Sequence, residues 1–476
     1  AMGESWSDLN AMEYLFSHHY STGVSPSVIG PYATGNFTTG IRDYDLAHNP
    51  LNYSDIGFDT TGVEVHADGE VWNGTQWSVR QALVKKWNHR FPYRDRRLQL
   101  RCVDGNATHS PLPPTRCPGN HRWIQLVFDS FLLQQGTTSM LDARDAMLAA
   151  DRMRFGGQDL KVMWNAFAAR GMGKGARVQN GDDGQPRPSF ASPRARNAVV
   201  RFRGPGGGRI YVGRYQARVS PVADLSRRTK LDAVARFAPG RYHFLYTSPR
   251  TGFARFTVRL RPGQHLSYRI QAPGNLAAAA GGAKVIASSA GSLNAAALLD
   301  GSEATNWGGV NGDGTNVDAR HPYVAVDLAG WRHRIHRVQV SAMLHPAPAS
   351  PTDVPLAKDP DPDSGSRFTA LRRFAIEVCV RHCGSSDARW HRVYTSPANA
   401  FPAVRPRPVA PNLTLRGFRL AHPVRASAVR LVALENQCTG YAGYAGEQDN
   451  DPTNATDCKT ASDRGSIVHV AELEVY

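Results

Sequence analysis

Apolar residues in the first part of the chain recur at three- and four-residue steps, the spacing of one face of an α-helix. Val79, Leu83, Val84 and Trp87 follow this spacing and predict a helix over residues 76–87. Residues 21–62 form a polar loop rich in Gly and Tyr, and loops of that length in compact domains are usually functional. We therefore expect residues 1–176 to be mainly helical. The other helices predicted there are Ser7–Phe16, Trp123–Leu133, Ser139–Arg154 and Asp159–Arg170.

The apolar period changes to two after residues 177–195, a linker rich in Gly, Asp, Pro and Ser. Alternating runs bounded by Pro and Gly then predict strands within residues 196–272. The pattern indicates a small β-sandwich, which we interpret as a spacer without a ligand of its own. The predicted strands cover residues 198–203, 242–246 and 254–260.

A second linker, rich in Ala, Gly and Ser, is predicted at residues 273–290. Strand-like runs continue from there to the C-terminus, separated by long loops rich in Pro and Asp, as in jelly-roll sandwiches. We therefore expect a β jelly roll over residues 291–476. The predicted fold is multidomain: a mainly helical part, then a small β-sandwich, then the jelly roll.

Length, hydropathy and charge narrow the class of protein. A chain of 476 residues exceeds one ordinary hydrophobic core, and it contains no run of eighteen apolar residues, so no membrane span is predicted. The net charge is +16. Because the Arg residues look scattered and no basic helix is visible, we expect no nucleic-acid partner. Attraction to an acidic surface such as a cell wall, or simple solvation, are the two alternatives for this charge.

The six cysteines form three local pairs in the sequence, Cys102 with Cys117, Cys379 with Cys383 and Cys438 with Cys458. An even number in such segments predicts disulfides and an extracellular location. The sequence does not choose among the fifteen pairings that six cysteines allow. A structural zinc site made from the last four cysteines and His382 is the alternative, and it lacks the paired C-x-x-C spacing.

Four side chains suggest catalytic chemistry. Glu4 and Asp8 lie one helical turn apart, so that one carboxylate can bind a metal while the other supports a metal-bound histidine. His66, on a Gly-flanked segment after the long loop, could donate a hydrogen bond to an oxyanion, and Arg42 could do the same or brace that region. Taken singly, each motif is more often structural: a capped acidic helix start, or a histidine satisfied within the fold.

Taken together, these motifs resemble the fungalysin group of thermolysin-like zinc metallopeptidases over about residues 1–175. The resemblance rests on Gly3-Glu4-x-Trp6-Ser7-Asp8, on Val65-His66-x-x-Gly69-Glu70-Val71-Trp72 and on closing-helix motifs at 139–151 and 164–173. It implies that Glu4 is the third zinc ligand and that Asp8 supports the ligands. It also implies that His66 stabilises the transition state and that Arg42 is an analogue of the substrate-clamping arginine.

The departure from that family is the absence of His-Glu-x-x-His from all 476 residues. That motif carries the family's two histidine ligands and its glutamate base. One carboxylate does not hold zinc at peptidase affinity, and without a base no water is activated. The chain also opens on Ala1 without a signal-peptide pattern. We therefore expect this chain alone to be inactive and to need the missing N-terminal half of the peptidase, on the same or another polypeptide.

A second resemblance covers about residues 285–476. Leu298-Leu299-Asp300-Gly301-Ser302-Glu303-x-Thr305-x-Trp307, Val324-x-Val326-Asp327-Leu328 and the terminal Ala471-Glu472-Leu473-x-Val475-Tyr476 resemble discoidin-like, coagulation-factor C-type domains of the galactose-binding-like fold. The resemblance implies a structural calcium ion at Asp300, Thr305 and Glu472, and a glycan or cell surface as partner. The alternative is that Asp300-Gly301 is only a turn.

These observations predict a secreted zinc metalloendopeptidase that hydrolyses peptide bonds of protein or peptide substrates with zinc-activated water. The alternative is a non-enzymatic extracellular adhesion or carbohydrate-binding protein, in which the peptidase segment persists only as a fold. An upstream His-Glu-x-x-His segment favours the first, and glycan retention without metal-dependent proteolysis favours the second.

Overall fold

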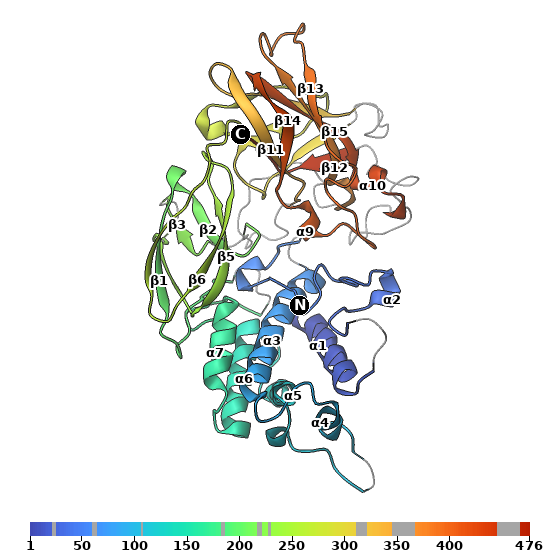
Figure 1. Cartoon of the computed structure of the whole chain (residues 1–476), viewed down its shortest axis with the longest axis vertical. Coiled ribbons are helices and arrows are strands. Elements are labelled where there is room, and N and C mark those ends of the chain that lie inside the picture. The colour runs from blue at the N-terminus through green and yellow to red at the C-terminus, as the bar shows by residue number, and fades with distance from the viewer. Residues whose placement is uncertain are drawn as a thin grey trace.

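The structure is a computed structural model. It describes residues 1–20, 25–59, 64–105, 108–181, 186–216, 221–226, 230–310, 321–344, 367–444 and 467–476. Within these ranges, none of the helices has both the length and the apolar character needed to cross a bilayer. A helical part is followed by two β-rich parts (Figure 1), which confirms the predicted multidomain layout.

Residues 1–176 are mainly helical, as predicted. Helix α1 packs against the long helix α3, and Trp6 of α1 meets Trp72 of α3 edge-to-face at 5.4 Å between ring centroids. Helices α5, α6 and α7 pack around the other sides of α3 or against one another. The helices described in this part are α1 (Met2–Ser17), α2 (Pro31–Thr34), α3 (Val65–Trp87), α4 (Arg96–Arg101), α5 (Gly119–Phe131), α6 (Met140–Phe155) and α7 (Leu160–Ala169), with 3₁₀ turns at Tyr53–Asp55 and Pro114–Arg116.

Helix α3 begins at Val65, well before the start predicted at residue 76. Residues 67–76 are all buried, so this half of the helix shows no alternation of apolar and polar faces for a periodicity argument to detect. The helix starts at Glu64, whose side chain accepts a hydrogen bond from the Ala67 backbone N–H. His66 therefore lies in the first turn of α3, and the expectation of a Gly-flanked non-helical segment there is wrong.

Residues 198–269 form two sheets that enclose an aromatic core. One sheet has the order β4-β1-β7 and the other β3-β2-β5-β6. Phe202, Phe237 and Phe244 lie between them. Phe190, in the segment predicted as a linker, is buried in the same core, so that segment packs onto the sandwich. The strands are β1 (Ala198–Arg203), β2 (Arg209–Val212), β3 (Ala223–Asp224), β4 (Val234–Phe237), β5 (Gly240–Thr247), β6 (Ala254–Leu260) and β7 (His265–Arg269).

The C-terminal part is an antiparallel sandwich. Its larger sheet has the order β13-β12-β15-β10-β8, and its second sheet β14-β11-β17. Phe374 of β12 meets Phe418 of β14 edge-to-face at 4.9 Å, so the two sheets share a core. The strands are β8 (Lys284–Ser288), β9 (Trp307–Val310), β10 (Tyr323–Asp327), β11 (His333–Ser341), β12 (Leu371–Cys379), β13 (His391–Thr395), β14 (Arg416–Ala426), β15 (Ala428–Asn436), β16 (Ile467–Val470) and β17 (Glu472–Val475); the short helices are α9 (Ala410–Leu413) and α10 (Gln437–Gly440).

Strand β8 lies inside the segment predicted as the second linker, residues 273–290. It pairs with β10 as the edge of the larger sheet. Its residues are exposed or half-buried, so its sequence shows little of the apolar alternation that identifies a strand. The pairing with β10, not the local sequence, makes this segment a strand.

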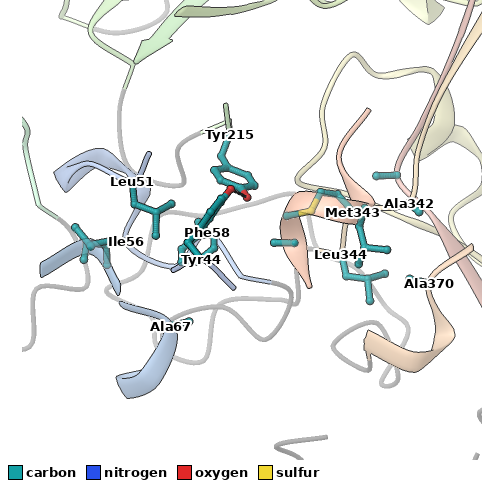
Figure 2. Packing of buried hydrophobic residues seen from close by; sticks show 14 of the residues in the cluster. Tyr44, Leu51, Ile56, Phe58, Ala67, Tyr215, Ala342, Met343, Leu344 and Ala370 are labelled. Atoms are coloured by element: carbon teal, nitrogen blue, oxygen red, sulfur yellow. Dashed lines mark hydrogen bonds between the residues drawn. The ribbon is translucent and has the colours of Figure 1, made fainter. Parts of the chain in front are cut away.

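The helical part and the C-terminal sandwich share one continuous hydrophobic core. Figure 2 shows Tyr44 and Phe58 of the helical part beside Tyr215, a residue of the segment that follows β2, with Met343 and Leu344 of the C-terminal part nearby. The hydroxyls of Tyr44 and Tyr215 are hydrogen-bonded, and Phe58 lies 5.2 Å from the Tyr215 ring. The three parts are therefore packed together rather than loosely tethered.

Two of the three predicted disulfides are present, Cys102–Cys117 and Cys379–Cys383. Cys438 is also disulfide-bonded. Cys458, its predicted partner, lies outside the described residues. The zinc alternative for the last four cysteines is therefore wrong, because Cys379, Cys383 and Cys438 are all oxidised.

Candidate functional site

Three segments of the helical part bring the predicted catalytic residues together. Glu4 comes from the first turn of α1, His66 from the first turn of α3, and Arg42 from the loop between them. The Glu4 Oε2 atom lies 3.0 Å from His66 Nδ1 and 3.7 Å from Arg42 Nη2. Arg42 Nη1 is 3.3 Å from the same imidazole nitrogen. All four predicted residues thus form one cluster, with Asp8 on its buried side.

Asp8 and Arg42 form the buried base of the cluster. Arg42 donates from Nε to Asp8 Oδ2 at 2.8 Å and from Nη2 to Asp8 Oδ1 at 3.0 Å, a two-pronged contact. The two side chains are 5% and 6% exposed, whereas those of Glu4 and His66 are 42% and 49% exposed. Burial alone would lower the pKa of Arg42, but the hydrogen bonds and charge of Asp8 outweigh it and raise that pKa.

Glu70 fixes the loop that carries Arg42. One turn after His66 on α3, its carboxylate accepts hydrogen bonds from the backbone N–H groups of Asp43 and Tyr44 at 2.8 and 2.9 Å. Burial, together with repulsion from the Asp43 carboxylate, raises the pKa of Glu70 well above its ordinary value. Because these bonds hold the two residues that follow Arg42, the guanidinium is fixed from the backbone as well as by Asp8.

The same loop is also held by the C-terminal sandwich. The Asp43 carboxylate accepts a hydrogen bond from the Ala410 N–H at 3.1 Å and lies 3.5 Å from Arg407 Nη2. Arg407 also donates to the Ile41 carbonyl at 3.0 Å. Burial, followed by repulsion from Asp59, raises the pKa of Asp43 to about 6. The loop of the candidate site therefore depends on contacts with a distant part of the chain.

A glycine allows the two helices to approach. A Cβ atom at Gly69 of α3 would lie 2.9 Å from the Ala1 carbonyl oxygen and 3.6 Å from the Glu4 Cβ. Any side chain at that position would therefore push the start of α1 away from α3. Gly69 lets Glu4 come within hydrogen-bond distance of His66.

Sequence reasoning missed Asn73, which donates to Asp8 Oδ2 at 2.8 Å and accepts from the Ser5 hydroxyl at 2.6 Å. It also missed the anchoring role of Glu70. The signal was available only in part, because residues 66, 70 and 73 are spaced to share one face of a helix. That spacing could be used only once the helix was known to begin at Val65.

The described residues do not by themselves make a zinc site. They contain no group of three His, Cys, Asp or Glu side chains placed to hold a metal ion. Glu4 supplies one half-exposed carboxylate, beside a cavity of about 490 Å³ lined by Ala1, Gly3, Glu64 and Val65 among others. What the cluster offers is one carboxylate ligand and two hydrogen-bond donors directed at the same place.

The C-terminal candidates also meet. Asp300 accepts hydrogen bonds from the Thr305 hydroxyl at 2.6 Å and from the Ser302 N–H at 2.9 Å. Glu472 Oε2 accepts from the N–H groups of Gly301 and Ser302. The second oxygen of the fully buried Glu472, Oε1, has no hydrogen-bond partner among the described residues.

Both of these carboxyl groups favour the protonated form. Asp300 is exposed as a whole residue, but its carboxyl group turns into the loop, and desolvation raises its pKa to about 6. Desolvation and then repulsion from Asp300 and Glu474 raise the pKa of Glu472 well above its ordinary value. A cation between the two would relieve both costs.

Comparison with known proteins assigns the helical part to a family. Residues 1–176 match the fungalysin metallopeptidase family, M36. The match spans all four clustered residues. It therefore agrees with the resemblance predicted from the sequence motifs.

The curated relatives of the fungalysin segment are fungal. It is similar to the extracellular metalloproteinase mep of Aspergillus niger, with 31% identity over 181 residues, which are 37% of this chain and 25% of the relative. An extracellular metalloproteinase of Fusarium vanettenii is 32% identical over 183 residues, 38% of this chain and 26% of the relative. The chain thus spans about a quarter of the length of these relatives.

Solved structures give only distant matches. A family 32 carbohydrate-binding module of C. perfringens NanJ, solved with galactose, has a TM-score of 0.22 and 13% identity, covering 40% of this chain and 98% of the module. An F5/8 type C domain from Bacteroides fragilis has a TM-score of 0.21 and 14% identity, covering 39% of this chain and 80% of that domain. The description of the C-terminal sandwich rests on its own strand pairing.

Proposed function

We propose that this chain is part of a secreted zinc metalloendopeptidase and that a His-Glu-x-x-His segment outside residues 1–476 completes its site. The observation that carries the proposal is the convergence of Glu4, His66 and Arg42 within a segment that matches the fungalysin family. The naming of the curated relatives as extracellular metalloproteinases supports secretion. Protein or peptide substrates follow from the reaction class.

In the completed enzyme Glu4 would be the zinc ligand contributed by this chain, and the metal would supply a Lewis acid. The residues described here have their own tasks. His66 and Arg42 donate hydrogen bonds to the oxygen on which negative charge develops. Asp8, gripped by Arg42 and Asn73, holds the guanidinium in place. A donor that needs no reorganisation stabilises the charge more than water would.

The first test is the intact mass and N-terminal peptide map of the native protein, with its zinc content and chelator-sensitive proteolysis. We expect a species larger than 52.0 kDa, or a co-purifying chain, that carries His-Glu-x-x-His. We also expect purified residues 1–476 alone to retain little zinc and to be inactive. Stoichiometric zinc in residues 1–476 would contradict the proposal, and so would a native protein that carries no such segment; the adhesion alternative would then stand.

Variants of the native enzyme separate the roles. Glu4→Gln should lose zinc and activity together. His66→Phe should keep its zinc and lose about 10²–10³-fold in kcat, the usual effect of removing one oxyanion donor. The control is His48→Phe, because His48 lies on the same loop as Arg42 and its side chain is 84% exposed. Equal losses in the His48 and His66 variants would contradict the assignment.

We also propose a calcium ion at Asp300, Thr305 and Glu472. The unpartnered Glu472 Oε1 and the two mutually repelling carboxyl groups support it. Calcium prefers oxygen ligands, which these side chains and the loop carbonyls supply. Calcium should raise the melting temperature of residues 1–476 at pH 7.5, and Glu472→Gln should abolish the rise. An unchanged calcium response in that variant would contradict the site.

The C-terminal sandwich is proposed as the part that attaches the enzyme to a cell-surface glycan. The support is the resemblance of its sequence motifs to discoidin-like domains. Retention on immobilised galactosides by residues 1–476 would test it, and a chain that elutes with the void volume from every such matrix would contradict it.

A further inference from the structure

The positive charge of the chain is concentrated in one domain. Residues 196–272 contain sixteen of the 56 Lys and Arg residues but only two of the 40 acidic residues, Asp224 and Asp232. This segment therefore carries +14 of the net +16. The Arg residues are not scattered evenly, as their spread along the sequence had suggested, and a domain interpreted as a passive spacer holds nearly all the excess charge.

One face of this sandwich collects much of the charge. Along β1 the side chains of Ala198, Val200 and Phe202 point into the core, so Arg201 and Arg203 point outward. The outward positions of the neighbouring strands β4 and β7 include Arg236 and Arg269. The complete outer face of the sheet β4-β1-β7 consists of Val199, Arg201, Arg203, Val234, Arg236, His265, Ser267 and Arg269.

These arginines are close neighbours without acidic partners. Arg203 lies directly opposite Arg269 in the pairing of β1 with β7. Within the described residues, Arg201, Arg203, Arg236 and Arg269 form no ion pair, and the outer face has no Asp or Glu among its eight positions. Like charges placed opposite each other destabilise a sheet. An anion bound along this face would remove that repulsion.

The other face of the sandwich is already occupied. Tyr211, Leu245 and Phe253, on the outer side of the second sheet, form a buried cluster with Leu415 of the C-terminal part. Arg255 donates to the Leu415 carbonyl at 3.3 Å. The C-terminal part therefore covers the sheet β3-β2-β5-β6, and β1 lies on the opposite side of the sandwich (Figure 1).

An open groove continues the basic face. It has a volume of about 1010 Å³ and lies where β1 and β7 end. Arg203 and Arg269 line it together with Pro205, Gln271 and Pro273. A chain-like ligand could thus lie across the strands and extend into the groove.

We propose that the outer face of β4-β1-β7 binds an acidic polysaccharide. Guanidinium groups form two-pronged hydrogen bonds with carboxylate and sulfate groups, and a polymer presents such groups repeatedly to a row of arginines. Single-stranded nucleic acids require aromatic platforms for their bases, and this face has none. Binding to a membrane surface requires large apolar side chains that enter the lipid, and the face has only Val199 and Val234.

The test uses the whole chain and fluorescent dextran sulfate as the probe, titrated at several salt concentrations. The variant Arg201→Gln/Arg203→Gln/Arg269→Gln should bind at least tenfold more weakly and show a shallower dependence of affinity on salt, because fewer counterions are released. The control is Arg334→Gln/Arg389→Gln/Arg425→Gln, which removes the same charge from exposed positions of the C-terminal part. It should change the affinity less than twofold.

Uncharged dextran, duplex DNA and vesicles containing phosphatidylserine serve as comparison ligands. We expect none of them to bind as tightly as dextran sulfate. Equal weakening by the two triple variants would mean that only net charge matters, which overturns the proposal. Tighter binding of DNA or vesicles, or no binding of dextran sulfate by the wild-type chain, would overturn it as well.

Discussion

At the scale of single residues, Arg42 joins two carboxylates that differ in exposure. It grips the buried Asp8 with two hydrogen bonds and reaches the half-exposed Glu4 from the same guanidinium. Lysine could not do this, because its ammonium lacks the planar fork. The two acidic residues were recognisable from their spacing, but their unequal environments follow only from which of them faces the core.

Replacing Arg42 tests the strength of this pair. Arg42→Met leaves the Asp8 carboxylate buried and without its main partner, so the free energy of unfolding should fall by about 3–5 kcal/mol. Urea denaturation of residues 1–476 measures it. Arg154→Met is the control, because Arg154 pairs with Asp129 while its side chain is 49% exposed, and such surface pairs contribute about 0–1 kcal/mol. Similar losses for both variants would contradict the argument.

Asp300 predicts a pH dependence of stability. Burial of its carboxyl group raises its pKa from 3.8 to about 6 in the folded chain, so in this window the folded state binds more protons than the unfolded state. Without calcium, the contribution of Asp300 to stability should therefore fall as pH rises from about 4 to about 6 and then stay constant. The stability difference between wild type and Asp300→Asn, followed across this range in chelator, should show the fall. A difference that is flat or rises with pH would contradict it.

At the scale of elements, the candidate site depends on how closely α1 approaches α3. Gly69 removes the obstacle at the contact, and Trp6 packs against Trp72 to hold it. Asn73 then ties α3 to Asp8 and Ser5 of α1. The periodicity of either helix predicts a buried face but does not say which partner that face meets.

Two glycine substitutions separate helix propensity from close approach. Ala in place of Gly in a helix gains up to about 1 kcal/mol. Gly3→Ala meets nothing within 4 Å and should be neutral or stabilising. Gly69→Ala should instead lower the free energy of unfolding by about 1–3 kcal/mol through overpacking, because its Cβ would contact the Ala1 carbonyl. Thermal denaturation of both variants checks this, and a Gly69→Ala chain as stable as Gly3→Ala would refute it.

At the scale of the whole molecule, the three parts are joined by buried polar contacts as well as by apolar packing. Arg367, of the C-terminal part, forms an ion pair with Asp59, of the helical part, and both side chains are completely buried. Glu474 accepts a hydrogen bond from Phe253 N–H of the sandwich at 2.6 Å. Such contacts are costly to break from one side only, so they favour a single arrangement of the three parts.

The Asp59–Arg367 pair provides the test of this coupling. Arg367→Met leaves Asp59 buried and without this ion-pair partner and should destabilise the chain by about 3–5 kcal/mol. Arg373→Met is a matched control, because Arg373 pairs with Glu435 within the C-terminal part while 36% exposed, and should cost about 0–1 kcal/mol. Guanidinium unfolding followed by tryptophan fluorescence measures both. If Arg367→Met unfolds with the wild-type midpoint, the pair does not couple the parts.

The sequence by itself determined the kinds of element and the chemistry of the site. Helical and strand periods predicted the helical part and the β-rich parts, and short motifs identified Glu4, Asp8, Arg42 and His66. Local patterns succeed here because amphipathic elements show their period and because a zinc peptidase uses few residue types. They failed for the start of α3 and for β8, where complete burial or exposure removes the alternation.

Only the tertiary structure decided which groups meet. The pairing of Arg42 with Asp8, the bonds from Glu70 to the Arg42 loop, the contact of Arg367 with Asp59 and the alignment of arginines on β4-β1-β7 join positions far apart in the chain. No local pattern encodes such contacts, because they depend on the packing of whole elements. The charge of each residue is fixed by the sequence, but whether that charge is buried, paired or left facing solvent is fixed by the fold.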